Sequence, residues 1–539
     1  MRRAQLALAL LWSTPAASQS GIPGTAVIIV GAEAAAPVPM VGDGKSNADI
    51  ADILFLRLAR MGPDLITSGD KGFLPELARR WTRRDSLTLA FELDPRARWH
   101  DGTPVTARDV IFAFDRARDP TADAQKALLL RWVASVTAEG AGTVVIHFSK
   151  VYGEQMYDAV WHVQPLPAHL LDSIPRDRLE ASAYVQRPIG NGAYRFVRRD
   201  PGQRLELAAV PDFFLGRPGI GRVIFLLARD PDAQMNLMLD GTGDAYEGVS
   251  PPSNVVRIQA VKDLRVITVP TTNVGYLLFN QRARGDRSRP HPILSDVDVR
   301  RALVMALDRE ELARAAFGPY ASVPEGPVSQ LHWIREAKPL VKFDTAGARA
   351  LLARKGWRDS DGDGVLDQGG RPLTLQLNFP GPSATRSMLA PMVQEQWRRI
   401  GVKVDLLRLD GPVWGERRDK GEFDVDFASA VMDPSPAGMV QSWSCAGRNG
   451  SNVGQYCDPQ VDMHMERAIR GGPDAGKNWH ETIRLMVSDA PAAFLYTPSS
   501  AIAIHRRFDR VVLRPESFWA SIWQWRLKPE QMLPRDRTS

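Results

Sequence analysis

Three groups of side chains in this sequence have types and spacings that could do chemistry. The first is acidic: residues 359–367 read DSDGDGVLD, with carboxylates at alternate positions and a glycine at the sixth. A calcium-binding loop begins in this way, because it needs oxygen ligands at these positions and a glycine for its turn. The twelfth position is Gly370 rather than a bidentate glutamate, and a strand pattern replaces the second helix. The pattern therefore favours a solvated turn over a calcium site, and we predict no metal centre.

The second group is His100-Asp101, which invites comparison with a catalytic dyad. Hydrolysis by such a dyad also needs an activated nucleophile, and the sequence contains no G-x-S-x-G, H-E-x-x-H or C-x-x-C motif. We therefore interpret Asp101 as a turn aspartate and His100 as an exposed imidazole, and we predict no catalytic residue and no cofactor. A secreted hydrolase that cleaves peptides nevertheless remains one of the functions to be considered.

The third group is a pair of cysteines, Cys445 and Cys457. An even number of cysteines in an exported protein permits one disulfide bond that closes a short loop. The alternative is two buried thiols. We favour the disulfide bond.

Length and composition are those of a soluble globular protein with several domains. A chain of 539 residues suggests two to four domains. Apolar residues make up 44% of the chain and charged residues 24%, which is ordinary for this class. The net charge of +6 is small for this length, and many arginines stand beside acids, as in Arg108-Asp109. A surface of mixed charge follows, and we predict no nucleic-acid partner.

The first residues have the pattern of a secretion signal. Residues 1–3 (MRR) are positive, residues 4–12 are apolar, and residues 16–18 (AAS) form a small-residue cleavage site. We predict a signal peptide over residues 1–20. No cysteine follows the apolar stretch to carry a lipid anchor, and no later stretch reaches the roughly 20 apolar residues of a spanning helix. The expected location is the periplasm, without a membrane anchor.

Hydrophobic periodicity predicts the elements that position these groups. Alternation over residues 86–93 predicts a half-buried strand, which Asp94-Pro95 ends. Thr106, followed three residues later by Asp109, is a capping-box start for a helix. Residues 373–379, 383–400 and 402–407 predict a strand–helix–strand unit with parallel strands and a right-handed crossover.

Several motifs stand in the order found in one known family. Residues 72–81 (GFLPELARRW) resemble that family's PxLAxxW, and residues 99–112 (WHDGTPVTARDVIF) resemble its FHDGTPLTAEDVVFS. Residues 188–195 resemble its GTGPY turn, and residues 298–310 resemble DVRVRQALAYAIDRE. From about residue 25 to residue 510, the chain thus resembles family 5 extracytoplasmic solute-binding proteins. These are the peptide-, dipeptide- and nickel-binding receptors of ABC importers.

This resemblance implies an α/β fold of the two-lobed periplasmic-binding-protein type (type II), with an extra domain inserted in the first lobe. The expected division is residues 21–50, 186–272 and 500–539 for lobe I, 51–185 for its inserted domain, and 273–499 for lobe II. The implied function is to capture peptides or peptide-sized solutes between the lobes and deliver them to the membrane permease subunits of an ABC importer. We expect a monomer. The alternatives are the hydrolase and an exported holdase-like interaction protein.

The resemblance also places the ligand site within residues 423–462. In the family a loop aspartate there accepts the peptide's α-ammonium group. Counting forward from Phe423-Asp424 places Asp433 at that position, whereas counting back from Cys445 places the position near Ala430. Residues 443–458 resemble dipeptide-binding members, in which the two cysteines are bridged. The predicted ligand contacts are Asp433, Trp443, Tyr456, Trp414, Tyr276, Asn280 and Asn452.

Overall fold

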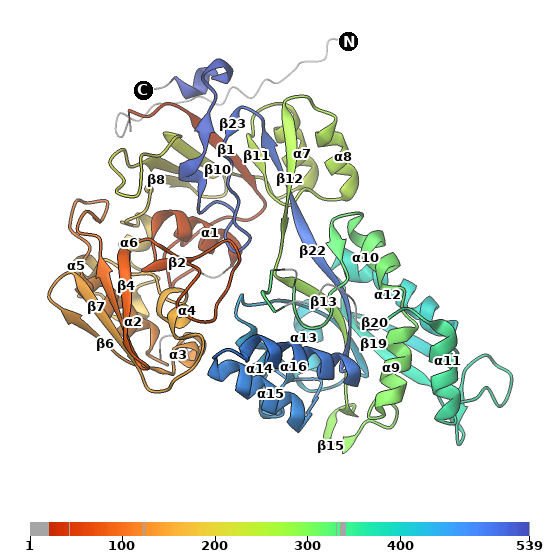
Figure 1. Ribbon diagram of the computed structural model, residues 1–539. Helices are drawn as coiled ribbons and strands as arrows, with labels where there is room; N and C mark the ends of the chain where they lie inside the picture. The colour runs from red at the N-terminus through yellow and green to blue at the C-terminus, as the bar shows by residue number, and fades with distance from the viewer. Residues whose placement is uncertain (1–20, 43, 122–123, 330, 335–340, 538–539) are drawn as a thin grey trace, which may run out of the picture.

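The structure is a computed structural model that describes residues 21–537, except residues 43, 122–123, 330 and 335–340 (Figure 1). The predicted signal peptide lies outside the described residues. Figure 1 shows three parts: a sheet with α7 and α8 at the top, a small sheet at the lower left, and a sheet flanked by many helices at the lower right. The fold is mixed α/β, as the sequence predicts.

One sheet of twelve described strands runs through two of these parts. Its order is β20-β19-β21-β13-β22-β11-β1-β10-β9-β8, and β12 and β16 pair with β22 beside this path. The strands are β1 (Thr25–Val30), β8 (Tyr194–Asp200), β9 (Arg204–Ala209), β10 (Arg222–Leu227), β11 (Ala245–Tyr246), β12 (Leu264–Pro270), β13 (Asn273–Phe279), β16 (Ala321–Ser322), β19 (Thr374–Pro380), β20 (Lys403–Leu409), β21 (Val425–Val431) and β22 (Ala492–His505).

The strand β22 is long enough to belong to both halves of this sheet. Its residues 492–496 pair with β13, and its residues 499–505 pair with β12, both antiparallel. Only residues 271–272 separate β12 from β13, so the chain passes from one half to the other here and returns along β22. Two crossing segments that lie side by side are the kind of connection around which hinged halves close.

The half that corresponds to lobe I is built around β1, which pairs in parallel with β10 and with β11. Its helices are α1 (Lys45–Leu54), α7 (Pro231–Leu239) and α8 (Pro252–Gln259). Trp519 and Trp525 near the C-terminus are buried in its hydrophobic core.

The half that corresponds to lobe II contains the predicted strand–helix–strand unit. The strands β19 and β20 are parallel and are joined through α12 (Ala384–Arg398), and Gly401 follows that helix with a φ of 82°. The other helices are α9 (Val297–Met305), α10 (Arg309–Phe317), α11 (Thr345–Arg354), α13 (Gly411–Asp419), α14 (Met439–Trp443), α15 (Pro459–Arg470) and α16 (Ala475–Asp489).

The inserted domain has its own antiparallel sheet, ordered β4-β5-β7-β6. The strands are β4 (Ala78–Asp85), β5 (Thr88–Leu93), β6 (Val133–Glu139) and β7 (Thr143–Phe148). The predicted capping box starts α2 (Ala107–Ala117), since the Thr106 N–H donates to Asp109 Oδ2 over 2.8 Å. The remaining helices are α3 (Ala124–Leu129), α4 (Gln155–Val160), α5 (Ala168–Leu171) and α6 (Ala183–Gln186). The short strand pairs are β2 (Ala59–Met61) with β3 (Phe73–Pro75), β14 (Arg282–Ala283) with β15 (Asp286–Pro290), β17 (Asp367–Gln368) with β18 (Arg371–Pro372), and β23 (Phe508–Asp509) with β24 (Arg526–Leu527).

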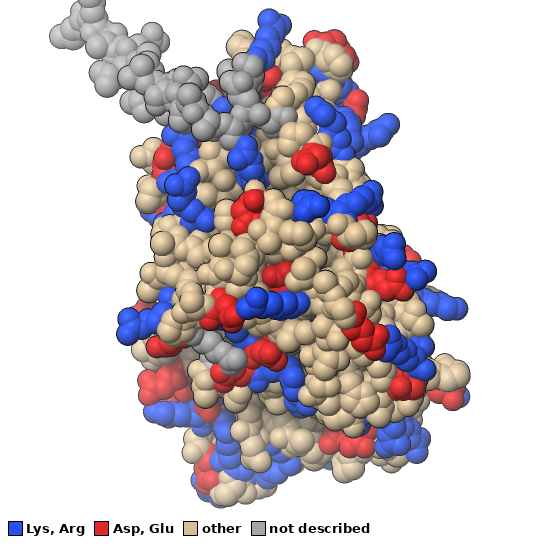
Figure 2. Space-filling view, turned by 90° about the vertical axis from the view of Figure 1, so that its left-hand side faces the viewer, with Lys and Arg blue, Asp and Glu red and all other residues tan. Residues whose placement is uncertain are grey.

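Charges of both signs are interspersed over the face of the molecule shown in Figure 2. The chain also forms ion pairs between solvent-exposed side chains, such as Arg84–Glu139 and Arg484–Glu481. Pairs of this kind add little stability, because water and salt screen them.

The imidazole of His100 is enclosed by the turn at residues 190–192, so the prediction that it is exposed was wrong. Its Nδ1 accepts a hydrogen bond from the Gly190 N–H over 3.2 Å, and its Nε2 donates to the Gly192 carbonyl over 3.0 Å. The neighbouring Asp101 instead contacts His169 Nε2 over 2.7 Å. His100 and Asp101 thus form hydrogen bonds with different partners, and the described structure shows no dyad between them.

This enclosed imidazole should make stability depend on pH. Burial lowers the pKa of His100 from 6.5 to about 4, so the unfolded chain binds more protons between these values. The contribution to stability is therefore present above pH 6.5 and is lost as the pH falls toward 4, by up to about 3 kcal/mol. We expect His100→Gln to flatten the free energy of unfolding over this range in urea titrations. The exposed His147→Gln is the control, and equal slopes in the two variants would contradict the prediction.

Candidate ligand-binding site

A cavity of about 810 Å³ lies where the two halves of the large sheet and the inserted domain meet. Small-ligand sites typically enclose about 300–1,000 Å³, so this volume suits a small molecule or a short peptide. Lobe I contributes Lys45 and Phe518 to the wall, and the inserted domain contributes Trp161. Lobe II contributes Phe317 and Asp433, and the two segments that cross between the lobes contribute Thr272 and Ser499.

Aromatic rings and neutral polar groups make up much of this wall. Trp161, Phe317, Tyr320 and Phe518 supply rings from three separate segments. Asn273, at the start of β13, adds a side-chain oxygen that is buried without a hydrogen-bond partner in the described structure. An unpaired buried acceptor costs about 1–3 kcal/mol, so a ligand N–H donor at this point would be stabilised.

Asp433 lies on this cavity, in the loop that follows β21. Its Oδ1 accepts hydrogen bonds from the Tyr157 hydroxyl over 2.6 Å and from the Ser435 N–H over 2.8 Å. Its backbone carbonyl accepts a hydrogen bond from Nε2 of His332 over 2.9 Å. These contacts fix the loop and hold the carboxylate at the cavity wall.

Lys45 and Asp49 of α1 form a second charged group on the wall. The Lys45 ammonium contacts Asp49 and lies 2.9 Å from Glu247 Oε1 and 4.1 Å from the ring centre of Phe518. Burial works against this charge, but the two carboxylates outweigh it and raise the pKa of Lys45. The ammonium is therefore neutralised by the protein itself.

Two of the predicted aromatic contacts lie in the core of lobe II. The ring centres of Tyr276 and Trp443 are 5.8 Å apart, and both pack on Phe494 at 6.0 and 5.5 Å. A third, Tyr456, donates its hydroxyl to Asp489 over 2.7 Å. The described lining of the cavity does not include these rings.

The remaining three predicted contacts make hydrogen bonds that organise backbone or other side chains. Trp414 Nε1 donates to the buried Asp426 over 2.7 Å, and burial raises the pKa of that carboxyl to about 6. Asn280 Nδ2 donates to the carbonyls of residues 421 and 423, and Asn452 Nδ2 donates to those of residues 444 and 456. Of the seven predicted residues, the structure therefore places Asp433 on the cavity, while ligand contact by the other six stays a prediction.

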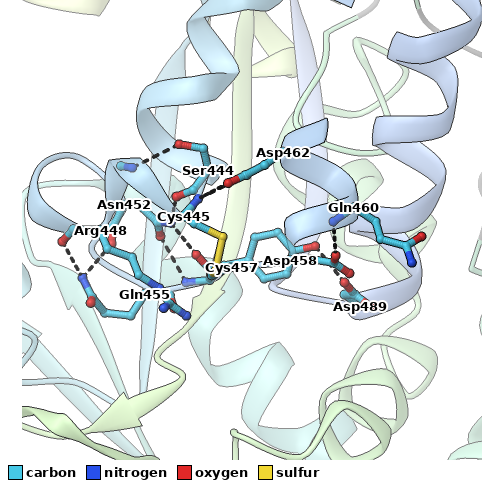
Figure 3. The surroundings of a disulfide bond; sticks show 12 residues. Ser444, Cys445, Arg448, Asn452, Gln455, Cys457, Asp458, Gln460, Asp462 and Asp489 are labelled. Carbon is cyan, nitrogen blue, oxygen red and sulfur yellow. Dashed lines mark hydrogen bonds between the residues drawn. A yellow bond between two sulfur atoms is a disulfide. The ribbon is translucent and has the colours of Figure 1, made fainter. Parts of the chain in front are cut away.

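The two cysteines form the predicted disulfide bond (Figure 3). The bond closes a short loop with a sequence separation of 12 residues. Hydrogen bonds stabilise this loop. The Asn452 side chain donates to two backbone carbonyls, and the Asp462 carboxylate accepts from the Cys445 N–H. The alternative of two buried thiols is excluded.

Removing this bond should lower stability moderately. Closing a loop of this length restricts the unfolded chain by about 3 kcal/mol at most. We expect the double variant Cys445→Ala, Cys457→Ala to lose about 2–3 kcal/mol of unfolding free energy in urea titrations. Reduction of the wild type should give a similar loss, and no change in either experiment would contradict the prediction.

The acidic stretch at residues 359–367 forms an exposed turn. The carboxylates of Asp359, Asp361 and Asp363 lie within 4.8 Å of one another. They also accept backbone hydrogen bonds of the turn itself, for example from the Gly362 N–H to Asp359 Oδ1 over 2.7 Å. Side-chain acceptors that satisfy local N–H groups are a usual feature of aspartate-rich turns.

Sequence reasoning missed most of the cavity wall. Trp161, Phe317 and Phe518 have no local pattern that separates them from core aromatics. Arg386 is not among the lining residues, but it follows the wall residue Thr385, donates from Nη2 to Ser429 Oγ over 2.5 Å, and keeps a buried Nε without a partner in the described structure. Only the folded arrangement identifies these residues.

The family and the fold agree with what similar proteins show. The family model for bacterial extracellular solute-binding proteins, family 5 Middle, matches residues 72–452, and the chain belongs to this family. The oligopeptide-binding protein AppA of Bacillus subtilis (strain 168) is 24% identical over 458 residues, which cover 81% of this chain and 80% of that protein.

Two solved structures have the same fold. The structure of AppA from Bacillus subtilis in complex with a nonapeptide has a TM-score of 0.75 at 22% identity, and the match covers 94% of this chain and 99% of that one. The structure of NikZ from Campylobacter jejuni in complex with Ni(L-His) has a TM-score of 0.74 at 22% identity, and the match covers 93% of this chain and 99% of that one.

Within the described residues, no helix is both long and apolar enough to cross a bilayer.

Proposed function

We propose that this protein is an exported receptor that captures peptides or peptide-sized solutes between two lobes and delivers them to an ABC importer. The observation that carries the proposal is the cavity of about 810 Å³, whose wall draws on both lobes and on the strands that cross between them. A ligand that touches both lobes stabilises the closed form by its additional contacts there. The relationship to an oligopeptide-binding protein supports peptides as the ligand class.

We assign the ligand's ammonium group to Asp433, the predicted contact that lies on the cavity. A partly desolvated ammonium needs a carboxylate partner, and hydrogen bonds between charged groups are about twice as strong as neutral ones. Asn273 Oδ1 suits a ligand N–H, and Arg386 Nε suits a ligand acceptor, because both atoms are buried without partners in the described structure. The rings of Trp161, Phe317 and Phe518 suit apolar side chains.

We also propose a two-lobed division of the chain and a periplasmic location. The division into lobe I, its inserted domain and lobe II follows the ranges given above, with the hinge at residues 270–273 and in β22. The signal peptide at residues 1–20 directs export, and the mature protein acts in the periplasm as a monomer. Its partners are the permease subunits of the importer.

A thermal-shift screen of di- to nonapeptides tests this function. A ligand that binds only the folded state raises the melting temperature. For the best peptide, we expect Asp433→Asn to weaken binding at least about tenfold and N-acetylation of the peptide to do the same, because each removes one charge of the pair. The exposed Asp405→Asn is the matched control. Failure of every peptide to shift the wild type would remove the peptide proposal.

A further inference from the structure

A second set of contacts joins the inserted domain to lobe II beside the cavity. The carboxyl of Glu154, which immediately precedes α4, accepts hydrogen bonds from the Thr67 hydroxyl of its own domain and from the Ser435 hydroxyl of lobe II. Glu154, Thr67 and Ser435 are 9%, 0% and 7% exposed. This carboxyl therefore bridges the two parts of the molecule in a place from which water is largely excluded.

Tyr157, one turn along α4 from Glu154, makes the neighbouring contact. Its hydroxyl donates to Asp433 Oδ1 over 2.6 Å, and the tyrosine is 1% exposed. The Ser435 N–H donates to the same oxygen, and among the described residues Asp433 Oδ2 has no hydrogen-bond donor. The Tyr157 hydroxyl thus occupies Oδ1 of the Asp433 carboxylate, which belongs to the other lobe. Oδ2 is the oxygen that remains for a ligand.

Backbone and ring contacts extend the same interface. The Gly153 N–H donates to the Ile469 carbonyl over 2.9 Å, and Trp333 Nε1 donates to Thr67 Oγ1 over 3.4 Å. All of these bonds connect groups of the protein. Opening the lobes would break together the bonds that cross between the two parts, which are Ser435–Glu154, Tyr157–Asp433, Gly153–Ile469 and Trp333–Thr67. A ligand is not needed to form them.

We propose that Tyr157 is a positioning residue that aims the Asp433 carboxylate at the cavity and that, with Glu154, it forms a latch that populates the closed form without a ligand. The inference rests on the two-lobe closure of the proposed function, but it does not depend on the nature of the ligand. Burial raises the pKa of Glu154 to about 7, against the effect of the two hydroxyl donors, which agrees with a carboxyl shielded by the joined lobes.

Distances between the lobes test the latch without any ligand. Spin labels at the exposed positions Ser173→Cys and Lys477→Cys, with the native disulfide intact, report on the inserted domain and lobe II. We expect the wild type to show a closed population, and Tyr157→Phe and Ser435→Ala each to lower the closed-to-open ratio about tenfold, because each removes a hydrogen bond to a carboxyl group. Tyr184→Phe is the matched control, since that hydroxyl donates to the Ile189 carbonyl, which is nearby in the chain and does not belong to lobe II. A wild type that is only open, or variants that match Tyr184→Phe, would overturn the latch.

A second measurement separates positioning from a merely structural role. The probes are the best peptide from the thermal-shift screen and its N-acetylated form. We expect Tyr157→Phe to reduce the preference for the free amine about fivefold, whereas Ser435→Ala, which keeps its backbone bond to Asp433, should weaken both forms equally. An equal loss of both forms in Tyr157→Phe would overturn the positioning role. If no peptide binds the wild type, the proposed function fails, while the distance measurement still decides the latch.

Discussion

Replacing Arg507 with methionine is expected to lower the free energy of unfolding by about 3–5 kcal/mol, because it leaves the buried Asp536 without the cation it contacts and removes one of the two arginines that pair with the buried Asp244, the other being Arg535. Arg507 is completely buried, and its guanidinium donates to Asp244 over 2.7 and 2.9 Å. It also donates to Asp536 Oδ2 and to the Thr25 carbonyl, over 2.5 and 2.6 Å. One side chain therefore joins the first strand, the loop before β11 and the C-terminal segment.

The loss should be measured by urea unfolding at pH 7 together with two further variants. Arg470→Met is the matched control, because that side chain is 67% exposed and lies 3.8 Å from its partner Glu466. The triple variant Arg507→Met, Asp244→Asn, Asp536→Asn should recover part of the stability, since it removes the uncompensated charges. A loss below about 1 kcal/mol in Arg507→Met would show that the cluster is not a major source of stability.

Gly153→Ala is expected to weaken ligand binding by up to about a hundredfold while leaving the unliganded fold stable. A Cβ added at Gly153 would lie 2.9 Å from Gly471 Cα and 3.0 Å from Ser68 Oγ. The first of these atoms is backbone of lobe II and cannot turn aside. Overpacking of this kind costs typically 1–3 kcal/mol, and here the cost falls on the closed form, where the two lobes meet. A ligand must then supply that free energy, which appears as a higher Kd.

Calorimetric titration of the best peptide checks this expectation. Gly142→Ala, in the same inserted domain, is the matched control, because a Cβ at that position would meet nothing within 4 Å. We expect its Kd to equal that of the wild type, and both variants to remain folded without ligand. An unchanged Kd in Gly153→Ala would mean that closure does not bring these two backbones together in solution.

Local sequence patterns predicted much of the fold but little of the cavity wall. The capping box at Thr106 and Asp109 and the parallel unit of β19, α12 and β20 were predictable, because the interactions that define them lie within a few residues or one supersecondary unit. The pairing of Cys445 with Cys457 was weighed against two buried thiols and is now confirmed. The enclosed state of His100 was not predictable, because the turn that covers it comes from residues about 90 positions later.

The aromatic residues illustrate the limit most clearly. Tyr276 and Trp443 were predicted ligand contacts, yet they pack on Phe494 inside lobe II, while Trp161 and Phe317 line the cavity. In the sequence, a ring that packs on another ring and a ring that faces a ligand give the same signal. Both are apolar side chains on the buried side of an element, and the pattern does not say which surface lies opposite.

The sequence by itself determined the family, the α/β class, and the strands and helices whose signals are local. Only the tertiary structure decided which residues enclose the cavity, since Lys45, Trp161, Phe317, Asp433 and Phe518 meet there from segments far apart in the chain. It also decided that Asp433 is held from the opposite lobe by Tyr157. The physical reason is that periodicity and capping record which side of an element avoids water, whereas a binding site depends on which distant element closes over that side.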